Sequence, residues 1–252
     1  MKSADLAIQI VNYKTKAYLN PLIESIVKDL AGSYLKAEIN ILDNASGDDL
    51  EDIGKKWRDH GVNIYKSDRN GGFGAGHNLL ASKTKATYLL ILNPDILLIE
   101  EHSIERLLRT FKQTGAAVVG PRLLTPRSTK DIYLKSPPVD QLKQQLWDHG
   151  RHYLEPNPYY VKDNLGEVAW VSGAVFLIGR QQFLDIGGFD EKFFLYYEEI
   201  DLCRRLRKKQ QLIMYDPTIQ ILHYGSAVAK KFSLHMLKSL LHFELKSLRQ
   251  LF

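Results

Sequence analysis

Short apolar runs alternate with helical patterns along the first 120 residues, and this alternation limits the fold more than any other feature. The apolar runs have the length of buried strands and cover residues 6–11, 37–42, 62–66, 87–92 and 116–120. Helical spacing of apolar residues separates them at 18–30, 49–60 and 103–114, and in a segment that ends near Lys85. Because parallel strands are joined by right-handed crossovers, the pattern predicts an α/β fold with a mainly parallel sheet and flanking helices.

The pattern changes in the second half of the chain. Residues 125–164 mix proline, aromatic and charged residues, which is typical of a long functional loop. Residues 167–178 predict a strand that Ser172 and Gly173 interrupt. A helix is expected over 198–209, two short strands over 212–215 and 219–223, and one long amphipathic helix over 227–252.

Charge and cysteine content narrow the class of protein. Lysine and arginine number 34 and aspartate and glutamate 29, so the formal net charge is +5. This excess fits an anionic partner, such as a nucleotide diphosphate, a lipid surface or nucleic acid, and does not choose among them. The single cysteine, Cys203, forms no intrachain disulfide, and no apolar stretch reaches the roughly 18 residues of a membrane span. We therefore expect a cytoplasmic protein that can lie on a membrane without crossing it.

Polar clusters follow three of the predicted strands at the point where each strand ends. They are Asn12-Tyr13, Asp43-Asn44 and Asn93-Pro94-Asp95. Ligands of open α/β sheets bind at the carboxyl ends of the strands, so the three clusters predict one site.

A glycine-rich turn, Asn-Gly-Gly-Phe-Gly-Ala-Gly, occupies residues 70–76 and opens a helix. It does not match the dinucleotide-binding fingerprint, because His77 stands at the last position and the turn follows the third strand. Glycine amides at a helix start can approach a phosphate or a sugar closely. A ligand-binding turn and a plain tight turn both fit the pattern.

Asp95 is the candidate metal ligand. Pro94 ends the preceding strand because it has no amide hydrogen, and it leaves Asp95 at the sheet edge. Mg²⁺ and Mn²⁺ prefer oxygen ligands and often take one or two carboxylates, with substrate phosphates and water completing the shell. A simple strand terminator is the alternative interpretation.

An aromatic run over 193–197 precedes acidic residues at the start of a predicted helix. An apolar wall raises the pKa of a neighbouring carboxylate, which suits a general base. The alternative is a dipole-matched helix start with an Asp201–Arg205 pair on a solvated face. His223, at the end of the last short strand, fits either a structural histidine or a ligand.

Together these segments resemble the inverting family 2 glycosyltransferases of the GT-A fold, and more narrowly bacterial rhamnosyltransferase-like members that build O-antigen and capsule polysaccharides. Seven segments carry the resemblance: ILDNAS at 41–46, NGGFGAGHN at 70–78, LNPD at 92–95, WVSGA at 170–174, GGFDEKFF at 187–194, YEEIDLC at 197–203 and HYG at 223–225. The resemblance implies a GT-A domain over 1–226, with a nucleotide-binding half (1–120) and an acceptor and catalytic half (121–226), followed by the helix at 227–252.

The resemblance also implies an activity. We expect a hexosyltransferase that moves a sugar from a nucleotide-diphospho-sugar to an acceptor with inversion, with L-rhamnose from dTDP-rhamnose as the donor. Mg²⁺ or Mn²⁺ is the expected cofactor. The expected acceptor is a glycan or a polyprenyl-diphosphate-linked sugar, and nucleic acid is not an expected partner.

Roles for single residues follow from the same resemblance. Glu199 is the expected base, and because it is one methylene longer than the family's usual aspartate, Glu198 and Asp190 stay as alternates. Asp95 and His223 are the expected metal ligands, and Asp43 is expected to contact the nucleoside base. The expected donor-binding residues are Asn12, Asp43, Asn44, Asn70, Gly72, Asn78, Asn93, Asp95, Ser172 and Gly173.

The C-terminal helix predicts a surface of its own. Its apolar face contains Leu237, Leu240, Leu241, Leu245, Leu248 and Phe252, and five basic residues oppose the single acid Glu244. This profile is typical of an interfacial helix on anionic lipid, at the inner face of a bacterial plasma membrane. Docking on its own domain, or on a second subunit of a homodimer, is the alternative.

Other functions fit the sequence less well. A transferase that uses a UDP- or GDP-sugar stays open. A nucleotidylyltransferase would carry a glycine-rich loop after the first strand, and residues 11–16 lack it. A non-catalytic nucleotide- or carbohydrate-binding module would not need carboxylates at both the metal and the base positions.

Overall fold

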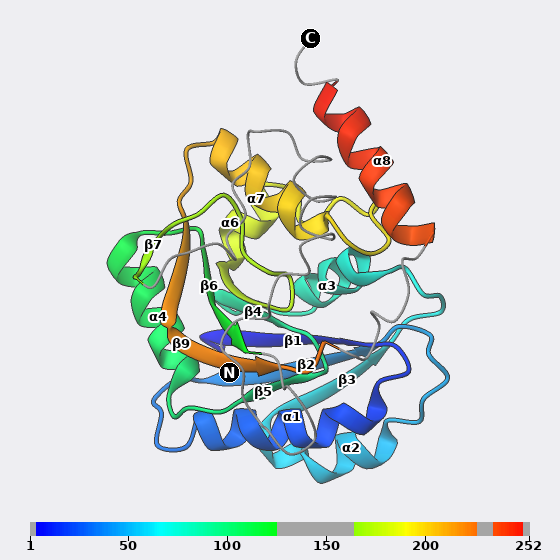
Figure 1. Ribbon diagram of the computed structural model, residues 1–252. Helices are drawn as coiled ribbons and strands as arrows, with labels where there is room; N and C mark the ends of the chain where they lie inside the picture. Colours follow the sequence, from blue (N-terminus) through cyan, green and yellow to red (C-terminus); the bar gives the residue numbers. More distant parts are fainter. Residues whose placement is uncertain (1–3, 125–163, 226–233, 249–252) are drawn as a thin grey trace.

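One mixed sheet forms the centre of the protein (Figure 1). The computed structural model describes residues 4–124, 164–225 and 234–248. Along the sheet the order is β3-β2-β1-β4-β8-β6-β9-β5, and β7 pairs with β9 outside this path. The strands are β1 (Leu6–Asn12), β2 (Ala37–Asp43), β3 (Val62–Lys66), β4 (Tyr88–Leu92), β5 (Ile96–Leu98), β6 (Val118–Leu124), β7 (Gly166–Glu167), β8 (Val175–Gly179) and β9 (Ile213–His223).

The pairing is parallel in the first half and mixed in the second. β1 lies between β2 and β4 and runs parallel to both, and β3 extends the parallel part beyond β2. β8 runs antiparallel between β4 and β6, while β9 is parallel to β6. The sheet is therefore mainly parallel, as the sequence predicts, and it runs through both predicted halves of the chain.

Helices cover both faces of this sheet (Figure 1). α1, α2 and α4 pack on one face and α3, α6, α7 and α8 on the other. Their bounds are α1 (Lys16–Asp29), α2 (Glu51–Lys56), a 3₁₀ turn η1 (Arg58–His60), α3 (Phe73–Ser82), α4 (Ser103–Thr114), α6 (Arg180–Asp185), α7 (Glu198–Lys208) and α8 (Leu234–Leu248).

Side chains of each strand alternate between two hydrophobic cores. In β4, Leu90 and Leu92 point to the core under α1, and Leu89 and Ile91 point to the core under α3 and α7. All four are buried. This two-sided burial explains why the central strands appear in the sequence as continuous apolar runs.

Several elements differ from the sequence predictions. β9 is one strand where two were expected, because its pairing with β6 continues across a bulge between Pro121 and Arg122. β5 and α6 were not expected, and both are too short to show a clear period. The predicted irregular segment lies almost wholly outside the described residues. In the described part of the chain, no helix combines the length and the apolar content that crossing a bilayer requires.

Candidate functional site

The three predicted polar clusters meet at the carboxyl edge of the sheet. Parallel pairing sets Asn12 of β1 beside Asp43 of β2, and Ile10 beside Leu92 of β4. The residues that follow Leu92 therefore leave the sheet at the edge where Asn12 and Asp43 lie. The structure confirms the meeting of these strand ends that the alternating pattern predicts.

Asn12 donates hydrogen bonds from the end of β1 to the turn that follows β2. Its amide nitrogen donates to Asp43 Oδ1 at 3.3 Å, to Ser46 Oγ at 3.2 Å and to Asp48 Oδ2 at 2.9 Å. The Asn12 hydrogen bond is the largest cause of a lowered pKa at Asp48. The Asn12 side chain is fully buried, and its place in donor binding stays a prediction. Asn12 holds the turn that carries Asp43.

The glycine-rich turn is tied to β2 by Asn44. The Asn44 side chain donates to Asn70 Oδ1 at 2.9 Å and to the carbonyl of Gly72 at 3.0 Å, and it accepts from the amide of Gly71 at 3.2 Å. Asn70 Oδ1 also accepts from the Gly72 amide at 2.9 Å. These bonds fix the turn against the strand end.

Gly72 joins this turn to the aromatic loop, residues 190–197. Its φ is +88°, and a Cβ atom there would lie 2.1 Å from the carbonyl oxygen of Phe194. The next amide, of Phe73, donates to that same oxygen at 3.0 Å. Only glycine allows this approach, which gives a structural reason for the glycine that the sequence alone leaves open.

Asn78 holds the start of the same loop from α3. Its side chain accepts from the amide of Phe189 and donates to the carbonyl of Phe189, both at 2.9 Å, and it donates to Glu191 Oε1 at 3.0 Å. Its oxygen fills the space beside Gly188, whose added Cβ would lie 2.4 Å from it. Asn78 thus orients the loop that precedes the acids.

Asp95 and His223 come together at the end of the sheet. β5 pairs with β9 so that Ile96 faces His223, and His223 Nε2 lies 3.4 Å from Asp95 Oδ1. The Asn93 amide nitrogen lies 3.4 Å from the same Nε2 atom. The three apolar residues 96–98 that follow Asp95 form β5, and its pairing with β9 produces this meeting.

This pair fits a divalent cation bound together with a diphosphate. The Asp95 carboxylate is buried, while the His223 side chain is 23% exposed. Within the described ranges, no three histidine, cysteine, aspartate or glutamate side chains gather as a metal cluster. Such a two-ligand set suits Mg²⁺ or Mn²⁺, which takes its other ligands from phosphate and water.

Glu198 and Glu199 begin α7 in different surroundings. Glu198 is buried, and no described residue donates a hydrogen bond to its Oε2 atom. Burial, and then the adjacent Glu199 charge, raise the pKa of Glu198 well above its ordinary value. The raised pKa favours the protonated form of Glu198.

Glu199 lies beside the turn at 172–174, which borders the carboxyl edge of the sheet. An added Cβ on Gly173 would lie 3.5 Å from the Cβ, Cγ and Cδ atoms of Glu199, so the Glu199 side chain lies beside the open face of this glycine. The next carbonyl, of Ala174, accepts from the Asn93 amide at 2.8 Å. Ser172 Oγ accepts from the Ala174 amide at 3.2 Å and shapes the turn. Glu199 thus lies one short turn away from the Asn93–Asp95 segment.

The backbone just before Glu198 and Glu199 is strained. Tyr196 and Tyr197 both have positive φ values, 72° and 73°. Non-glycine residues rarely adopt this conformation, and it concentrates at functional sites where surrounding contacts enforce it. The aromatic loop supplies those contacts, because its carbonyls bind Phe73 and, from α8, Ser239.

Asp190 and Asp201 lie in an ion-pair network behind the site. Lys246 of α8 donates to Asp190 at 2.7 Å and to Asp201 at 2.9 Å, and Arg205 donates to Asp201 at 2.7 Å. The Asp201–Arg205 pair that the sequence indicated is present, but Asp201 is fully buried and not on a solvated face. Burial alone would raise the pKa of Asp190, yet the Lys246 hydrogen bond and charge lower it to about 2. A paired carboxylate of such low pKa is a poor proton acceptor, so the geometry favours Glu199 over Asp190. No local pattern in the sequence predicts the role of Lys246, because its contacts join residues far apart in the chain.

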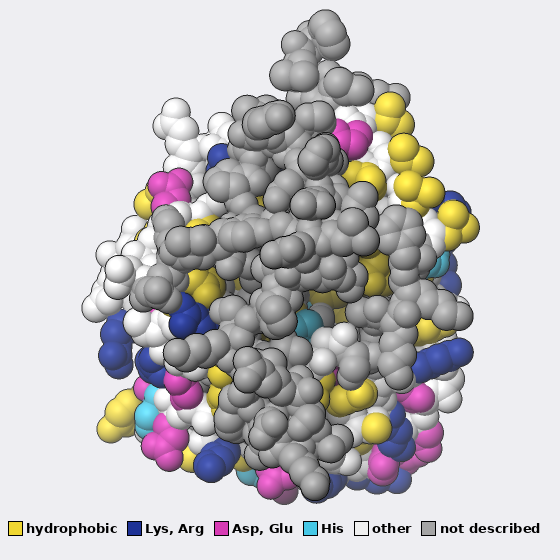
Figure 2. All heavy atoms as spheres, in the orientation of Figure 1, with side chains coloured by type: hydrophobic (Ala, Val, Ile, Leu, Met, Phe, Trp, Pro, Cys, Tyr) yellow, Lys and Arg dark blue, Asp and Glu magenta, His cyan; other side chains and the backbone are white. Residues whose placement is uncertain are grey.

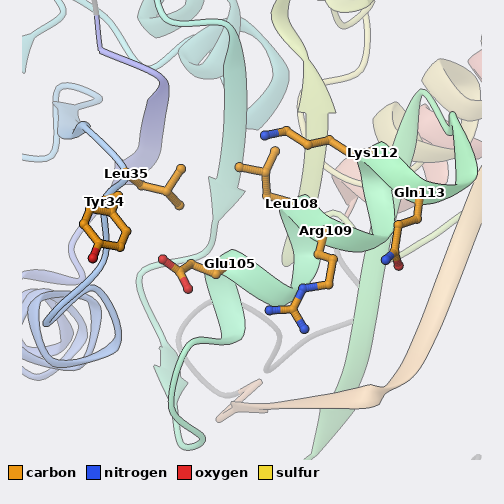
Figure 3. Close-up of a pocket in the computed structure, with 7 residues that line it drawn as sticks. All are labelled: Tyr34, Leu35, Glu105, Leu108, Arg109, Lys112 and Gln113. Carbon is orange, nitrogen blue, oxygen red and sulfur yellow. The ribbon is translucent and has the colours of Figure 1, made fainter.

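A surface pocket of about 350 Å³ lies elsewhere, over α4 (Figure 3). Tyr34 and Leu35 face α4 across it, and the α4 side chains that line it are Glu105, Leu108, Arg109, Lys112 and Gln113. Its lining includes none of the strand-end residues, so it is separate from the candidate site.

Comparison with known proteins places the chain in a family. The family described as "Glycosyl transferase family 2" matches residues 7–186. The hexosyltransferase Agl10 of low-salt glycan biosynthesis in Haloferax volcanii is 28% identical over 224 residues, covering 87% of this chain and 67% of Agl10. Rhamnosyltransferase WbbL of Escherichia coli K12 is 26% identical over 248 residues, covering 91% of this chain and 89% of WbbL.

A relative that matches over a shorter segment and a solved structure of similar fold are two further similarities. An N-acetylglucosaminyl-diphospho-decaprenol L-rhamnosyltransferase of Mycobacterium tuberculosis is 44% identical over 57 residues, which is 23% of this chain and 19% of that protein. The crystal structure of GalNAc-T7 with UDP, GalNAc and Mn²⁺ superposes with a TM-score of 0.66 at 15% identity. The match covers 93% of this chain and 49% of that one, so the chain spans about half of that protein. The superposition confirms the predicted GT-A fold.

Proposed function

The chain belongs to glycosyl transferase family 2, and on that basis we propose that it transfers a sugar from a nucleotide-diphospho-sugar to a hydroxyl group of an acceptor, with Glu199 as the base. One observation carries the assignment of roles. Glu199 lies beside the turn at 172–174, where an added Cβ on Gly173 would be 3.5 Å from its side chain, and the Ala174 carbonyl of the same turn accepts from the Asn93 amide. The proposed base and the proposed diphosphate-binding carboxylate, Asp95, are therefore near one edge of the sheet.

The reaction is a single displacement. The acceptor oxygen bonds to the anomeric carbon, the bond from that carbon to the diphosphate oxygen breaks, and Glu199 takes the hydroxyl proton. Because the nucleophile enters opposite the leaving group, the anomeric configuration inverts. The raised pKa of the buried Glu198 disfavours a second negative charge beside Glu199.

A divalent cation fits beside the leaving group. Asp95 and His223 would hold Mg²⁺ or Mn²⁺, which would stabilise the charge on the departing diphosphate. Asn44 holds the glycine-rich turn against the end of β2, and Asp43 lies where a nucleoside can reach that end. Asn70, Gly72, Asn78, Ser172 and Gly173 shape the donor site as backbone supports in this proposal.

Rhamnose from dTDP-rhamnose is the proposed donor sugar, and a polyprenyl-diphosphate-linked sugar is the proposed acceptor. Both rest on the names of similar proteins, two rhamnosyltransferases, one of which acts on a diphospho-decaprenol sugar. The similarity to a hexosyltransferase supports a second candidate, transfer of another hexose from a UDP- or GDP-sugar.

A donor panel tests the proposal. Purified protein would be incubated with Mn²⁺ and with dTDP-rhamnose, UDP-glucose, UDP-galactose or GDP-mannose, and release of nucleoside diphosphate would be measured with and without a polyprenyl-diphosphate-linked sugar. We expect release from dTDP-rhamnose that rises with acceptor. Release from a different donor would replace rhamnose, and binding of every nucleotide without turnover would indicate a non-catalytic binding module.

A further inference from the structure

α8 presents two chemically different faces. Met236, Ser239, Leu240 and Phe243 point inward and pack on the domain. Leu234, Leu237, Leu241 and Leu245 point outward and are 65%, 41%, 55% and 56% exposed. The spacing of three and four residues places the outward leucines on one stripe of the helix, here called the leucine stripe. Figure 2 shows hydrophobic side chains along this outer edge of the molecule, over α8.

The inner face fixes α8 to the loop that precedes the acids. Ser239 Oγ donates to the carbonyl of Leu195 at 2.8 Å, His235 stacks on Phe194 with ring centres 4.4 Å apart, and Lys246 binds Asp190 and Asp201. The helix is therefore docked on its own domain, as one of the two sequence interpretations expected. The leucine stripe is thus exposed even though the opposite face of α8 is docked on the domain.

Charge identifies the occupant of this stripe. The segment 227–252 contains five basic residues, Lys230, Lys231, Lys238, Lys246 and Arg249, against the single acid Glu244. Lys246 is neutralised inside the domain, and in the described part of this segment Lys238 is exposed beside the stripe. A second copy of α8 on the stripe would bring like charges together, whereas anionic lipid offers apolar chains below a negative surface.

We propose that the leucine stripe of α8 docks the protein on an anionic lipid surface, with Leu234, Leu237, Leu241 and Leu245 inserted among the acyl chains. The helix then lies in the plane of the membrane, and its inner face holds the aromatic loop and the acids next to that surface. The proposal deepens the proposed function, because a lipid-linked acceptor would present its sugar there.

Vesicle co-sedimentation tests the proposal with the intact chain. The probe is phosphatidylcholine vesicles with and without phosphatidylglycerol. The test variant carries Leu237→Gln, Leu241→Gln and Leu245→Gln. The matched control carries Leu165→Gln, Leu184→Gln and Leu212→Gln, three leucines of similar exposure (46%, 41% and 39%) outside α8.

We expect the wild type and the control to bind anionic vesicles, and the test variant to bind at least about tenfold more weakly, because inserted leucines carry the affinity. Binding should also weaken as salt rises. Equal binding by the test variant and the wild type, or no binding by the wild type, would overturn the proposal. A shift of the test variant from dimer to monomer in light scattering, without a change in vesicle binding, would assign the stripe to a homodimer instead.

This assay needs neither donor nor turnover, so its outcome is independent of the proposed reaction. Release of nucleoside diphosphate in solution should be the same in the test variant and the wild type, because the leucine stripe is exposed on the face of α8 opposite its contacts with the aromatic loop. Vesicle binding without any turnover would leave the docking surface standing and would refute the enzyme role alone.

Discussion

Substitution of Gly72 by alanine tests how the glycine-rich turn supports the aromatic loop. The added Cβ would lie 2.1 Å from the carbonyl oxygen of Phe194 and 2.9 Å from its C and Cα atoms, all of them backbone. With φ at +88° and ψ at −176°, the position also has a conformation that costs a non-glycine residue about 1 to 3 kcal/mol. Separation of the two segments would break the Phe73–Phe194 hydrogen bond, worth about 1 kcal/mol. We expect a loss of about 2 to 4 kcal/mol in the free energy of unfolding.

Gly115→Ala is the matched control. Gly115 has φ +67° at the end of α4, and nothing lies within 4 Å of an added Cβ. Its cost is the left-handed backbone alone, about 1 kcal/mol. The effect of alanine on the unfolded chain is common to both variants and cancels in the comparison.

Urea unfolding of the two variants measures the difference, and donor turnover measures its consequence. Gly72→Ala should be the less stable by at least about 1 kcal/mol, and its turnover should fall by at least about tenfold, because Phe194 lies just before the acids. Equal unfolding free energies in the two variants, or unchanged turnover in Gly72→Ala, would refute the role given to this contact.

Three further predictions concern the acids and the metal. Glu198→Gln should keep most of the activity, and its stability relative to the wild type should rise with pH, because the raised pKa of Glu198 in the folded state makes ionisation oppose folding from about pH 4.5 upward and glutamine cannot ionise. Urea titrations at pH 5 and pH 8 that show no such rise would contradict the raised pKa. Asp190→Asn should retain kcat within about threefold but lower stability by about 1 to 3 kcal/mol, through loss of the pair with Lys246, and a loss of kcat of about 100-fold in a stable variant would make Asp190 the base. His223→Ala should weaken Mn²⁺ binding by at least about tenfold in calorimetry with nucleoside diphosphate present, whereas an unchanged affinity would show that His223 is structural.

The sequence predicts most of the sheet because its signal is local. Apolar runs of strand length and helical spacing mark β1 to β4 and α4 closely, and the alternation predicts the edge where Asn12, Asp43 and Asp95 emerge. β5 could not be predicted in this way, because three residues show no period. Its pairing with β9 nevertheless brings Asp95 to His223.

Contacts between distant residues account for what could not be predicted. Asn12 is a polar residue at a strand end, where ligand-binding residues are expected. Only the packing of β1 against β2 shows that its side-chain amide donates hydrogen bonds within the protein. The sequence indicates only that Lys246 is one of the basic residues of the C-terminal helix, and the fold places it between Asp190 and Asp201. The leucines of the C-terminal helix formed one face in the sequence, and the structure divides them, with Leu240 inward and Leu241 outward.

Rates of sugar transfer in Glu199→Gln and Asp95→Ala test the central claim most directly. Each variant would be assayed beside the wild type with Mn²⁺, the active donor and a sugar acceptor, after urea unfolding has shown that it is folded. A positioned base contributes about 10² to 10⁴ in rate, so Glu199→Gln should lose at least about 100-fold in kcat. Asp95→Ala should lose activity that added Mn²⁺ restores only in part. Transfer at wild-type rates by both variants would contradict the assignment of this strand edge as the active site.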